Sequence, residues 1–291
     1  MDLLSIDSLS DEQIAALLDA ADQFAAGASA SDRHEGRIVF NLFYENSTRT
    51  LMSFAAAAAR LGATPLTLPV EQSSVKKGET LADTALTLNA MRPDALVLRH
   101  GANGSVAAVA ELMDCPVLNA GDGTNEHPTQ ALLDALTLRQ HFGRVEGLTV
   151  AICGDIRHSR VARSNRKLLE RLGATVRLAG PPSLLPDELP GRGEIGAAIG
   201  GADAVMMLRV QRERLHGELG DGPGEYLARY GLTAERLARA APHAVVLHPG
   251  PLNRGVEIAD EVADHPRSLI LRQVANGVAM RMAVLDLLLG A

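Results

Sequence analysis

The sequence is poor in aromatic residues and lacks tryptophan altogether. Its 291 residues include five phenylalanines and three tyrosines, and 35 acidic side chains outnumber 28 lysines and arginines, for a formal net charge of −7. A nucleic-acid-binding protein needs basic surface to replace the counterions of the phosphates, and often uses aromatic rings on which bases stack. The composition therefore argues against a nucleic-acid-binding function.

Cysteines and long apolar runs are also scarce. The two cysteines, Cys115 and Cys153, lie in apolar segments, and neither has a second cysteine or a histidine at the spacing of a zinc site. We therefore predict free, buried thiols in a reducing compartment, and neither a disulfide nor a structural metal. No apolar run approaches the ~18 residues of a membrane span, and residues 1–13 are acidic where a secretory signal would be basic. We expect a cytoplasmic protein with no membrane association.

The common nucleotide-binding motifs are missing too. The dipeptide Gly-Lys does not occur, so the chain has no Walker A motif. One G-x-G-x-x-G match exists at residues 191–196, but it follows a proline-rich stretch instead of a strand, and we interpret it as coincidental. A dehydrogenase that uses NAD is therefore disfavoured.

The alternation of short apolar runs with amphipathic segments predicts an α/β fold. Eight strands are expected, at 37–43, 64–68, 95–98, 116–118, 149–153, 175–178, 204–208 and 244–247. After a first amphipathic helix, further helices are expected at 79–91, 105–113, 129–142, 160–172, 226–240 and 274–289. This order is typical of parallel sheets with helices on both faces.

Eight strands fit two doubly wound parallel-sheet domains better than one sheet, with an active site in the crevice between the domains. A barrel of eight strand-helix units is the alternative, and the Pro/Gly-rich stretches after residue 178 disfavour it. Because the last helix has nothing after it to pack on, we expect it to return to the first domain. The predicted domains are 1–133 with 275–291, and 134–274.

The segment 43–50, Phe-Tyr-Glu-Asn-Ser-Thr-Arg-Thr, leaves a predicted strand and enters a predicted helix. Free backbone N–H groups and the helix dipole make such a turn an anion site. Three hydroxyls and one guanidinium add the donors that a phosphate needs, from Ser47, Thr48, Thr50 and Arg49. The alternative interpretation is purely structural, with Ser47 capping the helix and its neighbours lying on the surface.

Further polar residues follow other predicted strands. His127 and Gln130 are three residues apart after the strand at 116–118, where an imidazole and an amide can converge on one small group. Arg99 ends another strand, and arginines occur in both 154–160 and 208–212. Because ligands of open parallel sheets bind at the carboxyl ends of strands, paired arginines there suit a dicarboxylate. Solvated loop arginines are the alternative for Arg157 and Arg212.

Five strings in order along the chain, FYENSTRT, SSVKKGET, HPTQ, RVQRER and LHPGPLNRGVEI, resemble the motifs of the aspartate carbamoyltransferase family. The resemblance extends from residue 43 to residue 258 and implies transfer of a carbamoyl group from carbamoyl phosphate to the amine of L-aspartate, an early step of pyrimidine synthesis. It implies no cofactor and no catalytic metal.

The same resemblance implies roles for individual residues. The phosphate would be held by Ser47, Thr48, Arg49 and Thr50, and the carbamoyl oxygen would be surrounded by Thr50, Arg99 and His127. The carbamoyl NH₂ would be held by Gln130 and by backbone carbonyls near Gly250 and Pro251. The aspartate carboxylates would be bound by Arg160, Arg209 and Gln211. The catalytic residues it implies are Arg49, Thr50, Lys77, Arg99 and His127.

The resemblance also implies a homotrimer with shared active sites. The loop that carries Ser73 and Lys77 would reach into the site of the neighbouring subunit. Ser73 would bind carbamoyl phosphate there, and Lys77 would be both a catalytic residue and a ligand of aspartate. The sequence does not decide whether such trimers assemble further with regulatory or dihydroorotase-like chains. Gly250 departs from members of the family that carry leucine between the two prolines.

Two related functions stay open as alternatives. One is a carbamoyltransferase with ornithine as acceptor, against which the string HPGP argues, because that sister family has HCLP there. The other is a non-catalytic scaffold subunit of the same fold, which is disfavoured because no motif position has lost its polar side chain.

Overall fold

A computed structural model describes residues 1–70, 78–187, 194–210 and 224–290. The chain forms two compact units, the first made of Met1–Leu136 with Val274–Ala291 and the second of Thr137–Gln273. Two long helices carry the chain from one unit into the other, α5 (Pro128–Phe142) and α11 (Ile270–Leu289).

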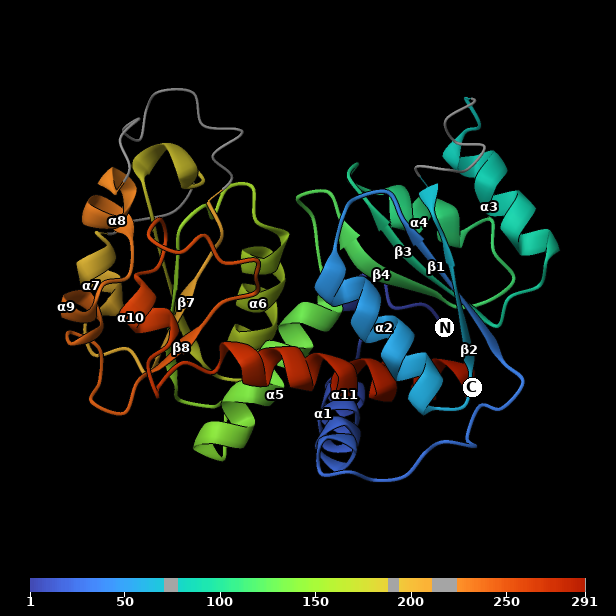
Figure 1. The fold of residues 1–291 in the computed structure, drawn as a ribbon, viewed down its shortest axis with the longest axis horizontal. Coiled ribbons are helices and arrows are strands. Elements are labelled where there is room, and N and C mark those ends of the chain that lie inside the picture. The colour runs from blue at the N-terminus through green and yellow to red at the C-terminus, as the bar shows by residue number, and fades with distance from the viewer. Residues whose placement is uncertain (71–77, 188–193, 211–223, 291) are drawn as a thin grey trace. The chain divides into compact units, whose positions relative to one another are not determined.

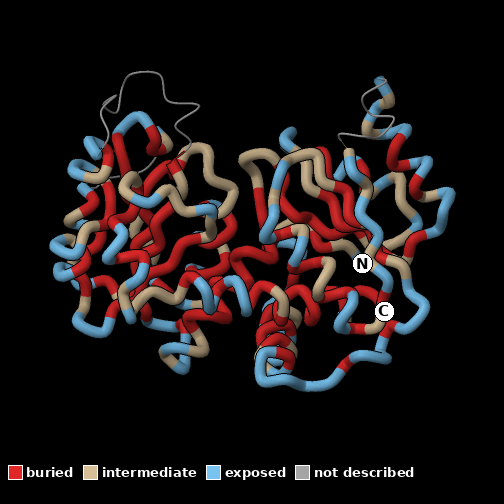
Figure 2. The backbone as a smooth tube through the Cα atoms, in the orientation of Figure 1, coloured by how far each residue is buried: buried red, intermediate tan, exposed pale blue. Residues whose placement is uncertain are grey.

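The first unit is built on a parallel four-stranded sheet. Its strands are β1 (Ile38–Phe43), β2 (Thr64–Leu68), β3 (Ala95–His100) and β4 (Val117–Asp122). They lie in the order β2-β1-β3-β4, with Val39 paired to Pro65 on one side and to Ala95 on the other. The central part of the sheet is buried, whereas β2 at its edge has no fully buried residue (Figure 2). This contrast is typical of a parallel sheet covered by helices on both faces.

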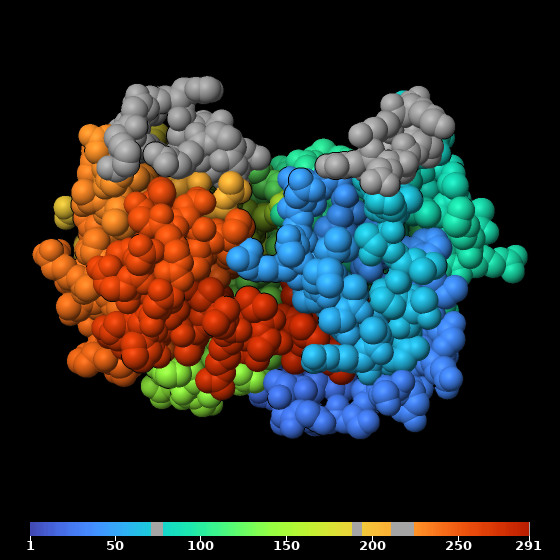
Figure 3. Space-filling view, in the orientation of Figure 1, coloured from blue at the N-terminus to red at the C-terminus, as the bar shows by residue number. Residues whose placement is uncertain are grey.

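Helices α2 (Thr48–Arg60) and α4 (Ser105–Ala110) pack against this sheet (Figure 1). The other helices of the first unit are the short η1 (Ile6–Ser8), α1 (Asp11–Ala25) and α3 (Leu81–Ala90). Helix α1 starts with a capping box in which the Ser10 hydroxyl accepts from the Gln13 N–H and the Gln13 side chain accepts from the Ser10 N–H. The outer side of α2 lies at the surface, in light blue in Figure 3.

The second unit repeats the arrangement with different strands. Its sheet contains β5 (Thr149–Cys153), β6 (Thr175–Ala179), β7 (Ala204–Met207) and β8 (Val245–Leu247), all parallel and in the order β6-β5-β7-β8. Its other helices are α6 (Arg160–Arg171), η4 (Pro182–Leu184), α7 (Ile195–Ile199), α8 (Glu225–Tyr230), α9 (Ala234–Leu237) and α10 (Asp260–Ala263). Two four-stranded sheets confirm the doubly wound α/β fold and exclude the barrel.

The strand order gives each unit one point at which successive connections leave in opposite directions. In the first unit this point lies between β1 and β3, and in the second it lies between β5 and β7. Ligands of open α/β sheets bind beyond the carboxyl ends of the strands at this point. A ligand site is therefore expected in the segments that follow these strands.

The expected helix at 226–240 is wrong, because the chain breaks at Gly231 between α8 and α9. The Arg236 side chain turns back and donates to the Gly231 carbonyl at 2.7 Å. A Cβ on Gly231 would lie 2.8 Å from the Val256 carbonyl oxygen, so only glycine fits. The strand predicted at 116–118 is longer than expected, since β4 continues to Asp122.

Both cysteines are free thiols, as expected, although only Cys153 is fully buried. Burial raises the pKa of Cys153 to about 12 and that of the half-buried Cys115 to about 11. Within the described ranges, no helix is long and apolar enough to cross a membrane. The same part of the chain contains no group of three or more histidine, cysteine or acidic side chains arranged to hold a metal.

Candidate active site

The loop between β1 and α2 is anchored to the neighbouring strand. The Tyr44 N–H donates to the Arg99 carbonyl at 2.9 Å, which joins the residue after β1 to the end of β3. Ser47 takes the N-cap position of α2, but its hydroxyl makes no capping hydrogen bond, so capping by this side chain is a wrong expectation. The start of α2 thus keeps both its unpaired backbone N–H groups and a nearby hydroxyl for another partner.

The next three residues open the first turn of α2. Thr48 and Arg49 are exposed, whereas Thr50 is buried and its carbonyl accepts from the Ser53 hydroxyl at 3.0 Å. An exposed arginine and threonine thus lie beside the positive end of a 13-residue helix, a position that favours anions. These features favour the functional interpretation of the segment over the structural one.

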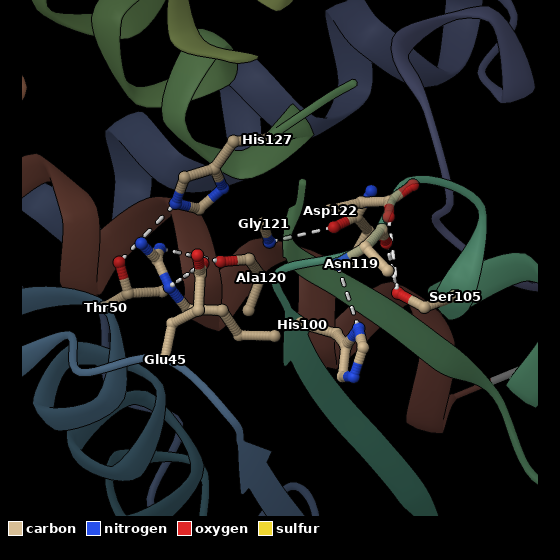
Figure 4. A network of polar contacts seen from close by, with 11 residues as sticks. Glu45, Thr50, His100, Ser105, Asn119, Ala120, Gly121, Asp122 and His127 are labelled. Atoms are coloured by element: carbon tan, nitrogen blue, oxygen red, sulfur yellow. Dashed lines mark hydrogen bonds and ion pairs between the residues drawn. The ribbon is translucent and has the colours of Figure 1, made fainter. Parts of the chain in front are cut away.

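His127 lies against this turn. Its Nε2 atom is 3.4 Å from the Thr50 hydroxyl, and both side chains are buried (Figure 4). His127 directly precedes α5, in which Pro128 occupies the first position and fixes the direction of the helix. The structure therefore brings together two residues that are 77 positions apart in the sequence and that were predicted to share one ligand atom.

Arg99 reaches the same edge of the sheet from the end of β3. Its Nη1 atom donates to the Ala120 carbonyl at 3.2 Å, and its Nε atom lies 3.3 Å from a Glu45 carboxylate oxygen. The side chain is only 14% exposed. A buried backbone carbonyl and a carboxylate together fix the direction of the guanidinium.

Gln130 completes the group of predicted residues in the first unit. It lies in the first turn of α5, is 7% exposed, and donates from Nε2 to the Asp134 carboxylate at 3.0 Å. We call Ser47, Thr48, Arg49, Thr50, Arg99, His127 and Gln130 the first cluster.

Asp122 is a structural residue of this edge that sequence reasoning missed. Its carboxylate accepts from the Gly104 N–H at 3.1 Å and from the Ser105 hydroxyl at 3.3 Å, which fastens the start of α4 to the end of β4 (Figure 4). It is 3% exposed. The available signal was an aspartate a few residues after the apolar run predicted as a strand at 116–118.

In the second unit, the predicted arginines follow β5 and β7. Arg160 is the first residue of α6, behind Ser159, whose hydroxyl caps the helix by accepting from the Ala162 N–H at 3.1 Å. Arg209 follows β7 closely and is partly exposed. Arg157 has a structural role, because its guanidinium donates twice to the Leu185 carbonyl, at 2.7 and 3.1 Å.

A buried pair, His248 and Glu257, supports the loop that carries Gly250 and Pro251. Glu257 accepts from the Asn253 N–H at 2.6 Å and lies 3.2 Å from Nε2 of His248. Because Nδ1 of His248 accepts from the Gly250 N–H at 2.8 Å, Nε2 must carry the ring proton and donate to Glu257. The Asn253 amide donates to the Val210 carbonyl at 3.2 Å, so this loop is fastened to the segment after β7.

Sequence reasoning missed this pair, although an acidic residue between Val256 and Ile258 signalled a buried carboxylate that needs partners. We call Arg160, Arg209, Gly250 and Pro251 the second cluster. Three predicted residues, Ser73, Lys77 and Gln211, lie outside the described residues.

Two family models cover almost the whole chain. Residues 1–140 match the aspartate/ornithine carbamoyltransferase carbamoyl-P binding domain, and residues 146–288 match the Asp/Orn binding domain of the same group. The chain belongs to the aspartate/ornithine carbamoyltransferase family.

Among curated members of this family, the chain is similar to aspartate carbamoyltransferase catalytic subunits. It is 56% identical to that of Rhizorhabdus wittichii over 98% of this chain and 94% of the relative, and 55% identical to that of Gluconobacter oxydans over the same shares. The family resemblance deduced from the five strings is thereby confirmed.

Solved structures of the family share the fold. Aspartate transcarbamoylase from Trypanosoma cruzi in complex with N-(phosphonacetyl)-L-aspartic acid has a TM-score of 0.87 at 33% identity, covering 98% of this chain and 94% of that one. Ornithine carbamoyltransferase from Thermus thermophilus has a TM-score of 0.88 at 29% identity, covering 99% and 98%. Aspartate and ornithine carbamoyltransferases therefore share this backbone fold, and only the sequence and the side chains can indicate which amino acid accepts the carbamoyl group.

Proposed function

We propose that this chain transfers the carbamoyl group of carbamoyl phosphate to the amine of L-aspartate, giving N-carbamoyl-L-aspartate and phosphate in pyrimidine synthesis. Identity of 55–56% to aspartate carbamoyltransferase catalytic subunits, against 29% to an ornithine enzyme, supports aspartate as the acceptor. The observation that carries the proposal is the first cluster, where an anion-binding helix start adjoins the buried Thr50–His127 pair. The reaction uses two water-soluble metabolites, which fits the cytoplasmic compartment expected from the sequence.

The first cluster would bind carbamoyl phosphate. The N–H groups of the first turn of α2, with the hydroxyls of Ser47 and Thr48 and the Arg49 guanidinium, would hold the phosphate. Gln130 would hold the carbamoyl NH₂ at the other end of the molecule. The first unit is accordingly proposed as the carbamoyl-phosphate-binding domain.

The carbamoyl oxygen would lie among Thr50, Arg99 and His127. The 3.4 Å between the Thr50 hydroxyl and His127 Nε2 allows both groups to approach a single oxygen atom. This oxygen gains negative charge when the carbonyl carbon becomes tetrahedral, and donors placed in advance stabilise that charge more than they stabilise the substrate. The three side chains would act as an oxyanion hole.

The bond changes need no covalent enzyme intermediate. The amine lone pair of aspartate attacks the carbonyl carbon, and the carbonyl electron pair moves to the oxygen. Collapse of this intermediate breaks the bond between carbon and the bridging oxygen and releases phosphate, which accepts the proton of the amine. The chain would contribute placement and charge stabilisation.

The second cluster would bind aspartate. Arginines offer paired donors to carboxylates, and Arg160 and Arg209 both follow strands at the point where the connections of the second sheet diverge. Gln211 would assist them. The backbone carbonyls near Gly250 and Pro251, held by the His248–Glu257 pair, would accept from the carbamoyl NH₂.

We further propose a homotrimer in which Ser73 and Lys77 serve the active site of a neighbouring subunit. The test is subunit mixing: Lys77→Ala and Arg49→Ala variants, each inactive, should regain part of the activity when exchanged into hybrid trimers. No recovery, with exchange verified by mass spectrometry, would contradict shared sites.

A ureido-product assay with carbamoyl phosphate tests the reaction itself, using L-aspartate and L-ornithine as alternative acceptors. Product with aspartate only is expected. Product with ornithine only would assign the chain to the sister activity. No product with either acceptor, from folded protein, would favour a non-catalytic scaffold.

A further inference from the structure

Two buried side chains of opposite charge interact electrostatically in the first unit, and one of them also contacts Gln130. Asp134 on α5 is fully buried, and Arg281 on α11 is 3% exposed. Neither belongs to the first cluster, although Asp134 accepts a hydrogen bond from one of its members, Gln130. Burying a charged side chain is costly unless another charge or several hydrogen bonds compensate, so the pair calls for an explanation.

Arg281 is held at a fixed place by its neighbours. Its Nη1 atom donates to the Gly277 carbonyl at 3.1 Å, and its guanidinium lies 5.0 Å from the centre of the Phe54 ring on α2. Burial lowers the pKa of Arg281 to about 9, against the opposing effect of the Asp134 carboxylate. Arg281 therefore provides a buried positive charge that attracts the Asp134 carboxylate.

An ionised carboxylate has consequences for the amide that faces it. A carboxylate accepts hydrogen bonds and donates none, so Gln130 must turn its NH₂ group toward Asp134. The carbonyl oxygen of Gln130 then points to the opposite side of the amide. Without a charged acceptor at Asp134, the two orientations of the amide would differ far less in energy.

The orientation of this amide decides which ligand group Gln130 can hold. A carbamoyl group ends in an NH₂, which needs an acceptor, whereas an acetyl group of almost the same shape ends in a methyl that makes no hydrogen bond. A reversed Gln130 would place its own NH₂ against the NH₂ of the ligand. Only the observed orientation favours a carbamoyl group over an acetyl group.

We propose that Asp134, with Arg281 as its buried counter-charge, is a positioning residue that orients the Gln130 amide and so gives the site its preference for carbamoyl phosphate over acetyl phosphate. This inference rests on the proposed function, because it takes Gln130 to contact the carbamoyl NH₂. Asp134 and Arg281 would thus act on specificity through Gln130, without contacting the carbamoyl group themselves.

The test compares two ligands that differ only in NH₂ and methyl. Asp134→Leu keeps the approximate shape of the side chain and removes the acceptor. The affinity for carbamoyl phosphate is measured as the KM, and that for acetyl phosphate as the inhibition constant against it. We expect the preference for carbamoyl phosphate to fall about tenfold, because a hydrogen bond to a charged group that fixes the amide is lost. Affinity for acetyl phosphate and for inorganic phosphate should change less than twofold.

Asp286→Leu is the matched control. Asp286 lies on α11, as Arg281 does, and pairs with Arg33 and His34. Its replacement removes a carboxylate from the same unit without removing the acceptor of Gln130. The preference should not change in this variant. In a Gln130→Ala background, Asp134→Leu should have no additional effect on the preference.

A second variant is needed because Asp134→Leu leaves Arg281 buried without its counter-charge. The double variant Asp134→Leu/Arg281→Met removes both charges, a change that folded proteins tolerate better than loss of one partner. It should show the same loss of preference. If either variant is folded by circular dichroism and keeps the wild-type preference, the inference is overturned. The wild-type assay with aspartate is independent: if it yields no product, the proposed function fails, whatever these variants do.

Discussion

Both units order their four strands in the same way, and each has an aspartate directly before its third strand. In the first unit, Asp94 precedes β3 and accepts from the Ile38 N–H at the start of β1, at 2.8 Å. In the second, Asp203 precedes β7 and accepts from the Thr149 N–H at the start of β5, at 2.7 Å. The amino-terminal edges of the two sheets are therefore fastened by the same device.

The carboxyl edges of the two sheets differ. Apart from Arg49 and Arg99, the first cluster consists of short or buried side chains, of which Thr50 and His127 contact each other. The second relies on longer, partly exposed arginines, Arg160 and Arg209. Directional donors suit a planar carbamoyl group, and charge suits two carboxylates. The common framework thus carries different side chains at the edge where open parallel sheets generally bind their ligands.

The largest effect is expected at the start of α2. Arg49→Ala should lower kcat by at least ~10³-fold, because the leaving phosphate loses its charged donor. Since Arg49 is exposed, circular dichroism and the melting temperature should stay unchanged. Arg60→Ala, at the opposite end of the same helix, is the control and should keep full activity. Normal turnover by the Arg49 variant would refute the phosphate assignment of the first cluster.

The oxyanion hole comes next. His127→Ala should lower kcat by ~10²–10³-fold while the KM for carbamoyl phosphate rises much less, because the interaction strengthens in the transition state. Steady-state kinetics at saturating aspartate measure the two constants separately. An unchanged kcat would remove His127 from the mechanism and leave it as a structural neighbour of Thr50.

The second cluster should respond differently. Arg209→Ala should raise the KM for aspartate ~10–100-fold, the equivalent of one or two charge-assisted hydrogen bonds, and leave the affinity for carbamoyl phosphate unchanged. Arg157→Ala is the comparison, because its guanidinium is used by the Leu185 carbonyl and should affect stability and not aspartate binding. If the two variants raised the KM for aspartate equally, the assignment of Arg209 to binding and of Arg157 to structure would be wrong.

The sequence alone predicted all eight strands, because buried parallel strands are continuous apolar runs. It also indicated the residues of the first cluster as candidates, because they follow the ends of strands, and their roles stay a prediction. It did not predict Asp122, Asp134, Glu257 or Arg281. These side chains act through partners that are distant in the sequence or on the next turn of a helix, and a charged residue in a helix is usually on its solvent face. Arg281 shows the difficulty: only packing against Phe54 and Gly277 reveals that it is buried.

Two local features of helices could also not be predicted from the sequence: the break at Gly231 and the missing side-chain cap at Ser47. Helical periodicity continues through 226–240, and nothing in it shows that the Val256 carbonyl occupies the space beside Gly231. The N-cap role of the Ser47 hydroxyl was a sound expectation from residue preference, yet its side chain makes no such bond. Deviations from local preference at the start of α2 coincide with the proposed phosphate site, where a free hydroxyl is of use.

The smallest effects should come from the device that the two units share. Burial acts to raise the pKa of Asp94 and of Asp203, but the backbone N–H donor and the adjacent Arg37 or His243 outweigh it and hold both pKa values below the ordinary value of aspartate. Each carboxylate therefore stabilises the fold above the pKa of the unfolded chain, ~3.9, and this contribution is lost as pH falls through the lower folded-state pKa.

Asp94→Asn and Asp203→Asn should each lower the local free energy of unfolding at neutral pH by about 1–2 kcal/mol. They should also reduce the loss of stability at acidic pH, and kcat should stay within about twofold of the wild-type value. Hydrogen exchange followed by mass spectrometry measures the stability of each unit separately. Asp94→Asn should reduce the protection of backbone amides from exchange in β1, and Asp203→Asn should reduce it in β5. Asp32→Asn, at an exposed position, should change neither. If either aspartate variant lost most of its activity while its strand kept full protection, the amino-terminal edge would be coupled to the chemistry, and the division between a shared framework and a specialised edge would have to be abandoned.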